Sequence, residues 1–184
     1  ALVPGAVTFC GPYPTFMDLR TGDYRQDWGP EDTLLKLAFA QLAHRYRVPI
    51  NIMALDTGAK TQDWQAGLQH AVSLMAVAAA GRAEMITGTG TLHGAAVYDN
   101  VNVILDAELF RIICEICEAP SEPWLPPSFA REPLEAWEAL GRPGARERAR
   151  ERFREILATH EPEPLPEDLD RELRRMIAAR EAEG

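Results

Sequence analysis

The sequence is poor in positive charge and has no long apolar run. It carries 19 Lys and Arg against 28 Asp and Glu, which gives a formal net charge of −9. A nucleic-acid partner is not expected, because no basic stripe is present to displace counterions from a phosphate backbone. No apolar run reaches the roughly 18 residues that a membrane-spanning helix needs, so no membrane segment is predicted.

Cysteine is also scarce, and a leader sequence is not expected. The three cysteines are an odd number, which does not suggest the paired framework of a secreted disulfide-rich domain. The first seven residues start with Ala1 and include no basic leader, so a processed or truncated start is expected instead of a signal peptide. The sequence therefore predicts a cytoplasmic protein.

Strand and helix patterns alternate in the first two thirds of the chain. Short apolar runs predict strands, and longer segments with helical periodicity lie between them. This alternation is typical of parallel α/β structure. The predicted strands are residues 6–9, 49–54 and 84–87, and the predicted helices are residues 30–47, 63–81 and the part of 101–117 that follows Asp106.

The composition changes after residue 119. Four prolines within residues 120–130 exclude a central strand or a helix interior, so this segment is predicted to be a linker. Residues 131–184 are rich in charge of both signs and have few apolar anchors. They predict two or three amphipathic helices whose charged faces are solvated, with pairs spaced four residues apart.

A polar or glycine-rich loop follows each predicted strand. These loops are residues 18–22, 56–63 and 88–93. Ligand sites of parallel α/β proteins form at the carboxyl ends of the strands, so the loops predict a site there; the alternative is that they are ordinary turns. The side chains predicted to gather at this end are Asp18, Asp56, Lys60 and His93.

Other motifs favour structural roles, and no metal site is predicted. Gly88-Thr89-Gly90 lacks the third glycine of a dinucleotide-binding fingerprint. Cys114 and Cys117 have C-x-x-C spacing but lie in an apolar helical run without a second ligand pair, so they predict a buried structural pair. His44 and His70 lie on predicted helices and are interpreted as surface or packing residues.

Short segments spread over most of the chain occur in the order in which a known family carries similar ones. Taken together they are fairly specific. They are residues 18–22, 30–31, 40–49, 59–67, 88–90, 104–106 and 145–162.

On these segments the chain resembles the trimethylamine methyltransferase family. The resemblance implies the C-terminal part of a (βα)₈ TIM barrel over residues 1–119, then the linker at 120–130 and the helical tail at 131–184. Family members move a methyl group from a methylated amine to the Co(I) corrinoid of a separate protein. The resemblance therefore implies a corrinoid (cobalamin) carried by a partner protein, a small methylated amine as substrate, and no cofactor bound by the chain itself.

The resemblance also assigns site residues. Founding members carry pyrrolysine where this chain has Asp56, and members without pyrrolysine are thought to demethylate quaternary amines such as glycine betaine. The chain resembles that branch, and Asp56, Lys60 and His93 are its candidate catalytic residues. A quaternary ammonium has no N–H to donate, so aromatic faces and a carboxylate must recognise it. The candidate substrate-binding residues are Asp18, Tyr13, Phe16 and Tyr98.

The chain departs from the family in two respects. The N-terminal barrel strands are absent, and a segment between residues 103–119 and the tail is missing. The alternative interpretation is therefore a truncated, non-catalytic remnant, or an interaction module whose tail helices bind a corrinoid protein. An open barrel would also expose sheet edges and apolar faces, which predicts self-association, for example as a homo-oligomer.

Overall fold

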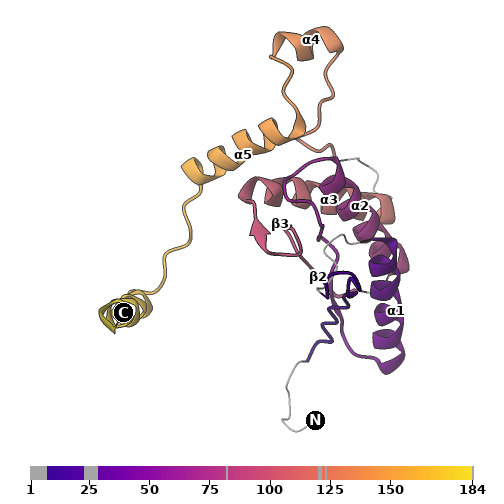
Figure 1. Cartoon of the computed structure of the whole chain (residues 1–184). Coiled ribbons are helices and arrows are strands. Elements are labelled where there is room, and N and C mark those ends of the chain that lie inside the picture. Colours follow the sequence, from indigo (N-terminus) through magenta and orange to yellow (C-terminus); the bar gives the residue numbers. More distant parts are fainter. Residues whose placement is uncertain (1–7, 23–28, 82, 120–121, 123, 184) are drawn as a thin grey trace. The chain divides into compact units, whose positions relative to one another are not determined.

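The computed structural model of the chain describes residues 8–22, 29–81, 83–119, 122 and 124–183. The chain divides into two compact units, Ala1–Phe153 and Arg154–Gly184. The first unit is mixed α/β and the second is helical (Figure 1). In chain order the elements are α1 (Pro30–Tyr46), β1 (Asn51–Met53), α2 (Trp64–Ala80), β2 (Met85–Thr87), β3 (Thr91–Leu92), β4 (Val97–Tyr98), α3 (Asn100–Glu118), α4 (Leu134–Ala139), α5 (Ala145–Thr159) and α6 (Glu167–Glu183).

Local sequence signals set the ends of the long helices. Pro30 lies in the first turn of α1, where its fixed φ suits the helix and its missing N–H is not needed. The Asp63 carboxylate caps α2 by accepting two backbone N–H groups of the first turn at 2.9 and 3.2 Å, and Gly81 ends the helix in the left-handed region. Asp99 caps α3 by accepting the backbone N–H of Val101 at 2.9 Å. This helix therefore begins before Asp106, where the sequence analysis placed its start.

Two short strands are parallel and are compatible with the predicted α/β arrangement. β1 pairs with β2 in parallel, with Asn51 opposite Met85 and Met53 opposite Thr87. On the other side of β1, a single parallel bridge joins Cys10 to Ile50. Of the first predicted strand, residues 6–9, residues 8 and 9 are described and are not in a strand, and the bridge lies at the next residue, Cys10. Residues 6 and 7 lie outside the described residues. The described strands do not close into a barrel.

A β-hairpin follows β2 that the sequence analysis did not predict. β3 and β4 are antiparallel, with Thr91 opposite Tyr98. Their connection has positive φ at three consecutive residues, His93 (51°), Gly94 (60°) and Ala95 (66°). Non-glycine residues rarely adopt this conformation, so His93 and Ala95 do not mark the turn in the sequence. Strands of two residues are also too short to show an alternating pattern.

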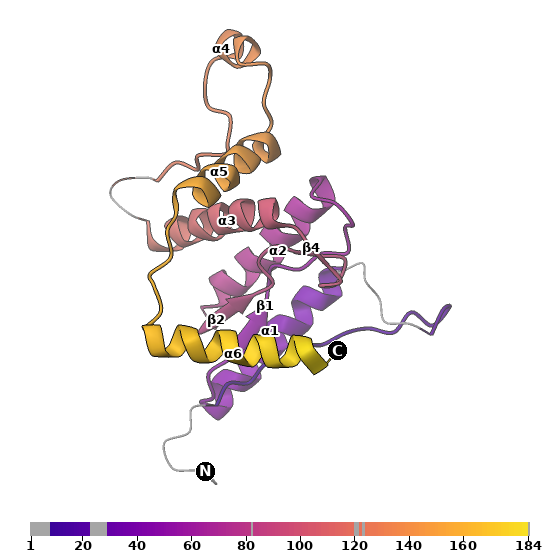
Figure 2. The same ribbon diagram turned by 90° about the vertical axis from the view of Figure 1, so that its left-hand side faces the viewer.

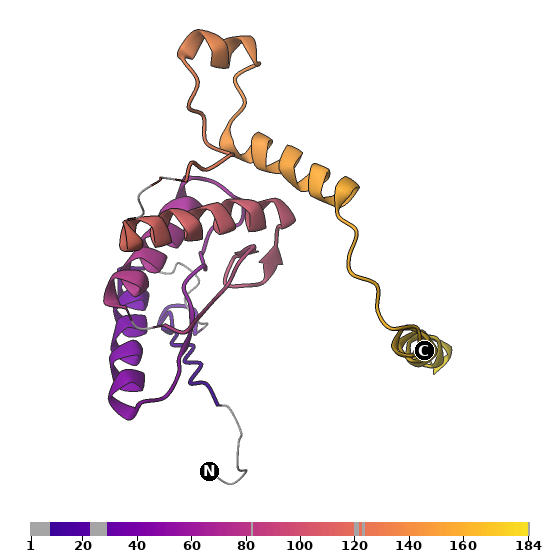
Figure 3. The same cartoon turned by 180° about the vertical axis from the view of Figure 1, so that it is seen from behind.

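The core lies between one face of β1 and three helices. Ile52 is buried against residues of α1, α2 and α3, and α2 lies between α1 and α3 (Figures 2 and 3). Asn51 and Met53, which flank Ile52 on β1 and point to the other face, are only half-buried. Met85 on β2 is 43 % exposed. The helices therefore cover one face of the parallel pair. The buried core residues are Ala40, Ala43, Ile50, Ile52, Ala54, Leu55, Leu74, Val77 and Ile113.

Helices α4, α5 and α6 occur where the sequence predicted amphipathic helices. Between α3 and α4, the described residues of 120–130 contain no helix or strand, and Ser128 donates its N–H and its hydroxyl to the buried carboxylate of Glu108 on α3. Arg146 at the start of α5 forms an ion pair with Asp99 at 2.7 Å. Within the described residues, every helix is too short or too polar to cross a membrane.

Gly88 provides a test of the β2 exit, and Gly67 is its control. Gly88 has a φ of +103°, and a Cβ there would lie 2.1 Å from the carbonyl oxygen of Leu55. We expect Gly88→Ala to lower the free energy of unfolding by about 2 kcal/mol or more in urea denaturation. Gly67 lies within α2 with nothing within 4 Å of its added Cβ. We expect Gly67→Ala to raise stability by about 0.5–1 kcal/mol. Equal stability of both variants would contradict the close approach of Gly88 to the Leu55 carbonyl oxygen.

The partly exposed face of the parallel pair generates a second prediction. We expect the purified chain to self-associate in size-exclusion chromatography with light scattering, because among the described residues β2 pairs only with β1 and side chains such as Met85 are exposed. Met85→Lys should shift the distribution towards monomer. Leu140→Lys, at an exposed position that ends α4, should not. A cooperatively melting wild-type monomer would show that other parts of the chain cover this face.

Candidate functional site

The loops that follow β1 and β2 lie against each other. The backbone N–H of His93 donates to the Ala59 carbonyl, and that of Gly94 donates to the Thr57 carbonyl, each at 2.9 Å. The loops carrying Asp56 and His93 therefore share one end of the parallel pair. Buried backbone groups in both loops are satisfied by these contacts, which fixes the loops relative to each other.

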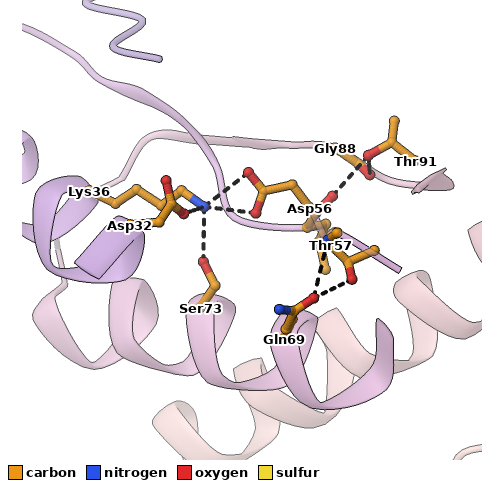
Figure 4. Close-up of polar contacts among 10 residues, drawn as sticks. Asp32, Lys36, Asp56, Thr57, Gln69, Ser73, Gly88 and Thr91 are labelled. Atoms are coloured by element: carbon orange, nitrogen blue, oxygen red, sulfur yellow. Dashed lines mark hydrogen bonds and ion pairs between the residues drawn. The ribbon is translucent and has the colours of Figure 1, made fainter. Parts of the chain in front are cut away.

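Asp56, the first charged residue after β1, is buried in an ionic cluster (Figure 4). Both of its carboxylate oxygens accept hydrogen bonds from the Lys36 ammonium, at 2.8 and 3.0 Å. The same ammonium lies 2.6 Å from a carboxylate oxygen of Asp32, one helical turn earlier on α1, and donates to the Ser73 hydroxyl at 3.4 Å. Asp56 is 1 % exposed, and Lys36 and Asp32 are also buried.

Burial dominates the electrostatics of this cluster. It raises the pKa of Asp56 to about 6, although the nearby Lys36 ammonium acts in the opposite direction. Burial also raises the pKa of Asp32, again against Lys36. When all three groups are ionised, two carboxylates share one ammonium, so the cluster carries one net negative charge in a region of low dielectric.

A second buried network connects α2, α3 and the loop after β2. His70 Nδ1 lies 2.8 Å from one oxygen of Asp106. The other oxygen of Asp106 accepts the Gly90 backbone N–H at 2.7 Å and the Asn102 side-chain amide at 3.1 Å. Asp106 therefore anchors the Gly88–Gly90 loop to two helices. His70 Nε2 and the Asn102 side-chain oxygen are buried and have no hydrogen-bond partner among the described residues.

The three candidate catalytic residues lie in the two adjoining loops but differ in environment. Asp56 is enclosed by the ionic cluster. Lys60 is exposed, and its ammonium donates to the carbonyl of Gly58 in its own loop at 2.7 Å. His93 is half-buried, and no group in the described part of the chain forms a hydrogen bond with its buried Nδ1. Their catalytic roles remain predictions.

The candidate substrate-binding residues lie in two places. Tyr98 is on β4 and 62 % exposed, and its ring lies so close to Gly90 that a Cβ there would be 2.9 Å from it. The other three, Asp18, Tyr13 and Phe16, lie in the segment that follows the bridge between Cys10 and Ile50. The Asp18 carboxylate accepts hydrogen bonds from the Arg20 guanidinium at 2.7 and 3.0 Å. That Asp18 lies near Asp56 at the carboxyl end of the strands remains a prediction.

The sequence analysis missed Asp32, Lys36 and Asp106. The available signal was helical spacing, since residues 32, 36, 40 and 43 form the buried face of α1 and two of them are charged. His70 was interpreted as a surface or packing residue; it is buried, but it also contacts Asp106.

The C-x-x-C motif is not a buried pair. Cys114 is half-buried and Cys117 is exposed, so the prediction was wrong for Cys117. Cys117 lies in the last turn of α3, one residue before the helix ends at Glu118. Among the described residues, no three His, Cys, Asp or Glu side chains are grouped so that they could hold a metal ion.

Asp56→Asn tests the energetic effect of the buried carboxylate. Because the pKa of Asp56 is raised from 3.8 to about 6, the folded state binds this proton more tightly than the unfolded state. The stabilising contribution of protonated Asp56 is therefore fully present below about pH 4 and is lost as pH rises through about 6. We expect the unfolding free energy of the wild type, relative to Asp56→Asn, to fall by at most about 3 kcal/mol over this window. Urea denaturation at several pH values measures this, and parallel pH dependences would contradict it.

Comparison with known proteins identifies relatives of the chain. Trimethylamine methyltransferase MttB of Methanosarcina barkeri is 23 % identical over 209 residues, which cover 95 % of this chain and 41 % of that protein. Trimethylamine methyltransferase MttB2 of Methanosarcina mazei is 30 % identical over 111 residues, which cover 60 % of this chain and 22 % of that protein. The chain thus spans about two fifths of the length of MttB.

The match to the family itself has two parts. The profile of the family described as trimethylamine methyltransferase (MTTB) matches residues 1–123 and residues 119–184. The two segments meet at residues 119–123, where the predicted linker begins. Together they extend over the whole sequence, so the chain belongs to the trimethylamine methyltransferase family.

Proposed function

We propose that the chain is the C-terminal part of a methyltransferase that moves a methyl group from a methylated amine, specifically a quaternary ammonium, to the Co(I) corrinoid of a partner protein. The observation that carries this proposal is the family match over the whole chain. The adjoining loops after β1 and β2, with a buried acidic cluster behind them, support it.

The chain's own residues would bind and orient the methyl donor. A net negative charge in the buried Asp32–Lys36–Asp56 cluster attracts a cation through a low-dielectric region. The exposed ring of Tyr98 offers an aromatic face to the methyl groups of a quaternary ammonium. The leaving tertiary amine is neutral, so no strong general acid is required, and a dry, weakly polar pocket favours the loss of the substrate's charge.

The corrinoid supplies the cobalt nucleophile that accepts the methyl group. The resemblance to the family assigns that corrinoid to a separate protein. We therefore assign the loops of this chain to the methyl donor and leave the corrinoid to the partner. In-line placement of the donor methyl group is then the chain's contribution to rate.

Asp56 bears on the choice of substrate. A carboxylate is not an electrophile, so it cannot reproduce the chemistry of the pyrrolysine that founding family members carry at the matching position. Both of its oxygens are also engaged by Lys36. A permanently charged quaternary ammonium group, such as that of glycine betaine, needs only charge and aromatic faces, which are the groups this chain offers.

A ligand titration followed by NMR tests the proposed site. We expect glycine betaine to shift the amide signals of residues 57–60 and 88–94. Its carbon isostere, 3,3-dimethylbutanoate, carries a neutral tert-butyl group in place of the trimethylammonium group. It should bind at least about tenfold more weakly, because it lacks the positive charge that the cluster attracts. Equal effects of both ligands, or shifts confined to other residues, would contradict the proposal.

An activity assay tests the substrate assignment. We expect the purified chain, mixed with a Co(I) corrinoid protein, to give no methyl transfer from trimethylamine and little or none from glycine betaine. The first expectation follows from Asp56, and the second from a chain that spans 41 % of a relative's length. Loss of Co(I) absorbance reports transfer, with Methanosarcina barkeri MttB and trimethylamine as the positive control. Robust transfer from trimethylamine would overturn the assignment.

A further inference from the structure

Lys36 contacts both carboxylates of the buried cluster. It lies on α1, twenty residues before Asp56 in sequence, and is itself buried. Figure 4 shows its ammonium between Asp32 and Asp56, above Ser73 on α2. The lysine therefore links α1, α2 and the carboxyl end of β1.

We propose that Lys36 is a positioning residue, which fixes the Asp56 carboxylate at the end of β1 and, by sharing its single charge with Asp32, leaves one net negative charge there to select a cationic substrate. This inference rests on the proposed function, because it assigns a use to the charge beside the loops. It goes beyond the family match, which says nothing of Lys36.

The hydrogen-bond geometry supports the positioning role. An ammonium has three donors and no acceptor. Those of Lys36 meet Asp32 at 2.6 Å, both oxygens of Asp56 at 2.8 and 3.0 Å, and the Ser73 hydroxyl at 3.4 Å. Because every direction has an acceptor and the group is buried, neither the ammonium nor the Asp56 carboxylate can rotate without losing a charged contact.

The charges that face Asp56 support the selection of a cation. From α1 these are Lys36 and Asp32, and from α2 it is His70, whose charged form would favour an ionised Asp56. His70 is in turn bonded to Asp106 on α3. Within the Asp32–Lys36–Asp56 cluster, Lys36 balances one carboxylate and the other is left over. A bound cation would offset that remaining charge.

Stability alone does not account for such an arrangement. Taking charged groups out of water is costly, and apolar side chains of similar volume often stabilise a fold as well or better. Lys36 lies on the same buried side of α1 as the apolar residues Ala40 and Ala43. A Met or Leu at position 36 would complete an apolar face at helical spacing. A role for its charge therefore explains Lys36 better than packing does.

The first experiment follows the titration of the Asp56 carboxyl carbon by NMR in the full chain. Lys36→Met keeps the length of the side chain and removes its charge, so the midpoint should rise by about one pH unit or more. Asp32→Asn removes the competing carboxylate and should lower it. Ser73→Ala, the matched control, loses only the longest contact and should leave the midpoint almost unchanged.

The outcomes separate the positioning role from the proposed function, because this titration needs no substrate. A midpoint that is the same in Lys36→Met and the wild type would overturn the positioning role. If Lys36→Met does not fold, Asp32→Asn decides: an unchanged midpoint there would show that the two carboxylates do not share Lys36.

The second experiment tests the selection of a cation. Asp32→Asn leaves one carboxylate and one ammonium in the cluster, so the preference for glycine betaine over 3,3-dimethylbutanoate should fall at least about threefold while the fold is kept. A preference that persists in this variant would overturn the selection role but not the positioning role. If neither ligand binds the wild type, the proposed function and the selection role both fail, and the titration alone reports on Lys36.

Discussion

The ammonium of Lys36, buried between two carboxylates, connects elements that are far apart in sequence. Asp32 and Lys36 come from α1, Asp56 ends β1, and Ser73 belongs to α2. An ion cluster of this kind tolerates little displacement, because each buried charge is costly unless its partners are in place. The position of the β1 exit, and hence of the loop from Thr57 to Lys60, depends on it. The loop after β2 is then placed by its backbone bonds to that loop and by the contact between Gly90 and Asp106.

The sequence predicts elements well where the signals are local. The Asp63 cap, the glycine at the end of α2 and the alternation of strands and helices are properties of neighbouring residues, and the structure has them. The ionic cluster and the hairpin are different. Lys36 meets Asp56 only because α1 packs beside β1, and the turn at His93 is held by bonds to a distant loop. Such contacts depend on tertiary packing, which no short window of sequence contains.

The same limit applies to the candidate site. Asp56 was singled out from its position after a strand, and the prediction that its loop adjoins that of His93 agrees with the backbone bonds between them. Its burial and its lysine partner were not foreseen, and they change its chemistry. An exposed carboxylate would contact a cation directly, whereas a buried and fully bonded one acts through its field. Lys60, by contrast, bonds within its own loop and remains accessible.

The bond between Ser128 and Glu108 bears on how the family varies in length. The two family-matched segments meet at residues 119–123, and the M. barkeri relative matches over 209 residues although this chain has 184. Just after this join, Ser128 is tied to the buried Glu108 of α3, which closes a loop of 20 residues. The entropy of closing a loop grows only logarithmically, by about 0.6 kcal/mol for each doubling of length. Insertions and deletions at the join are therefore nearly neutral for the stability of α3, and this point of the chain is open to evolutionary change in length.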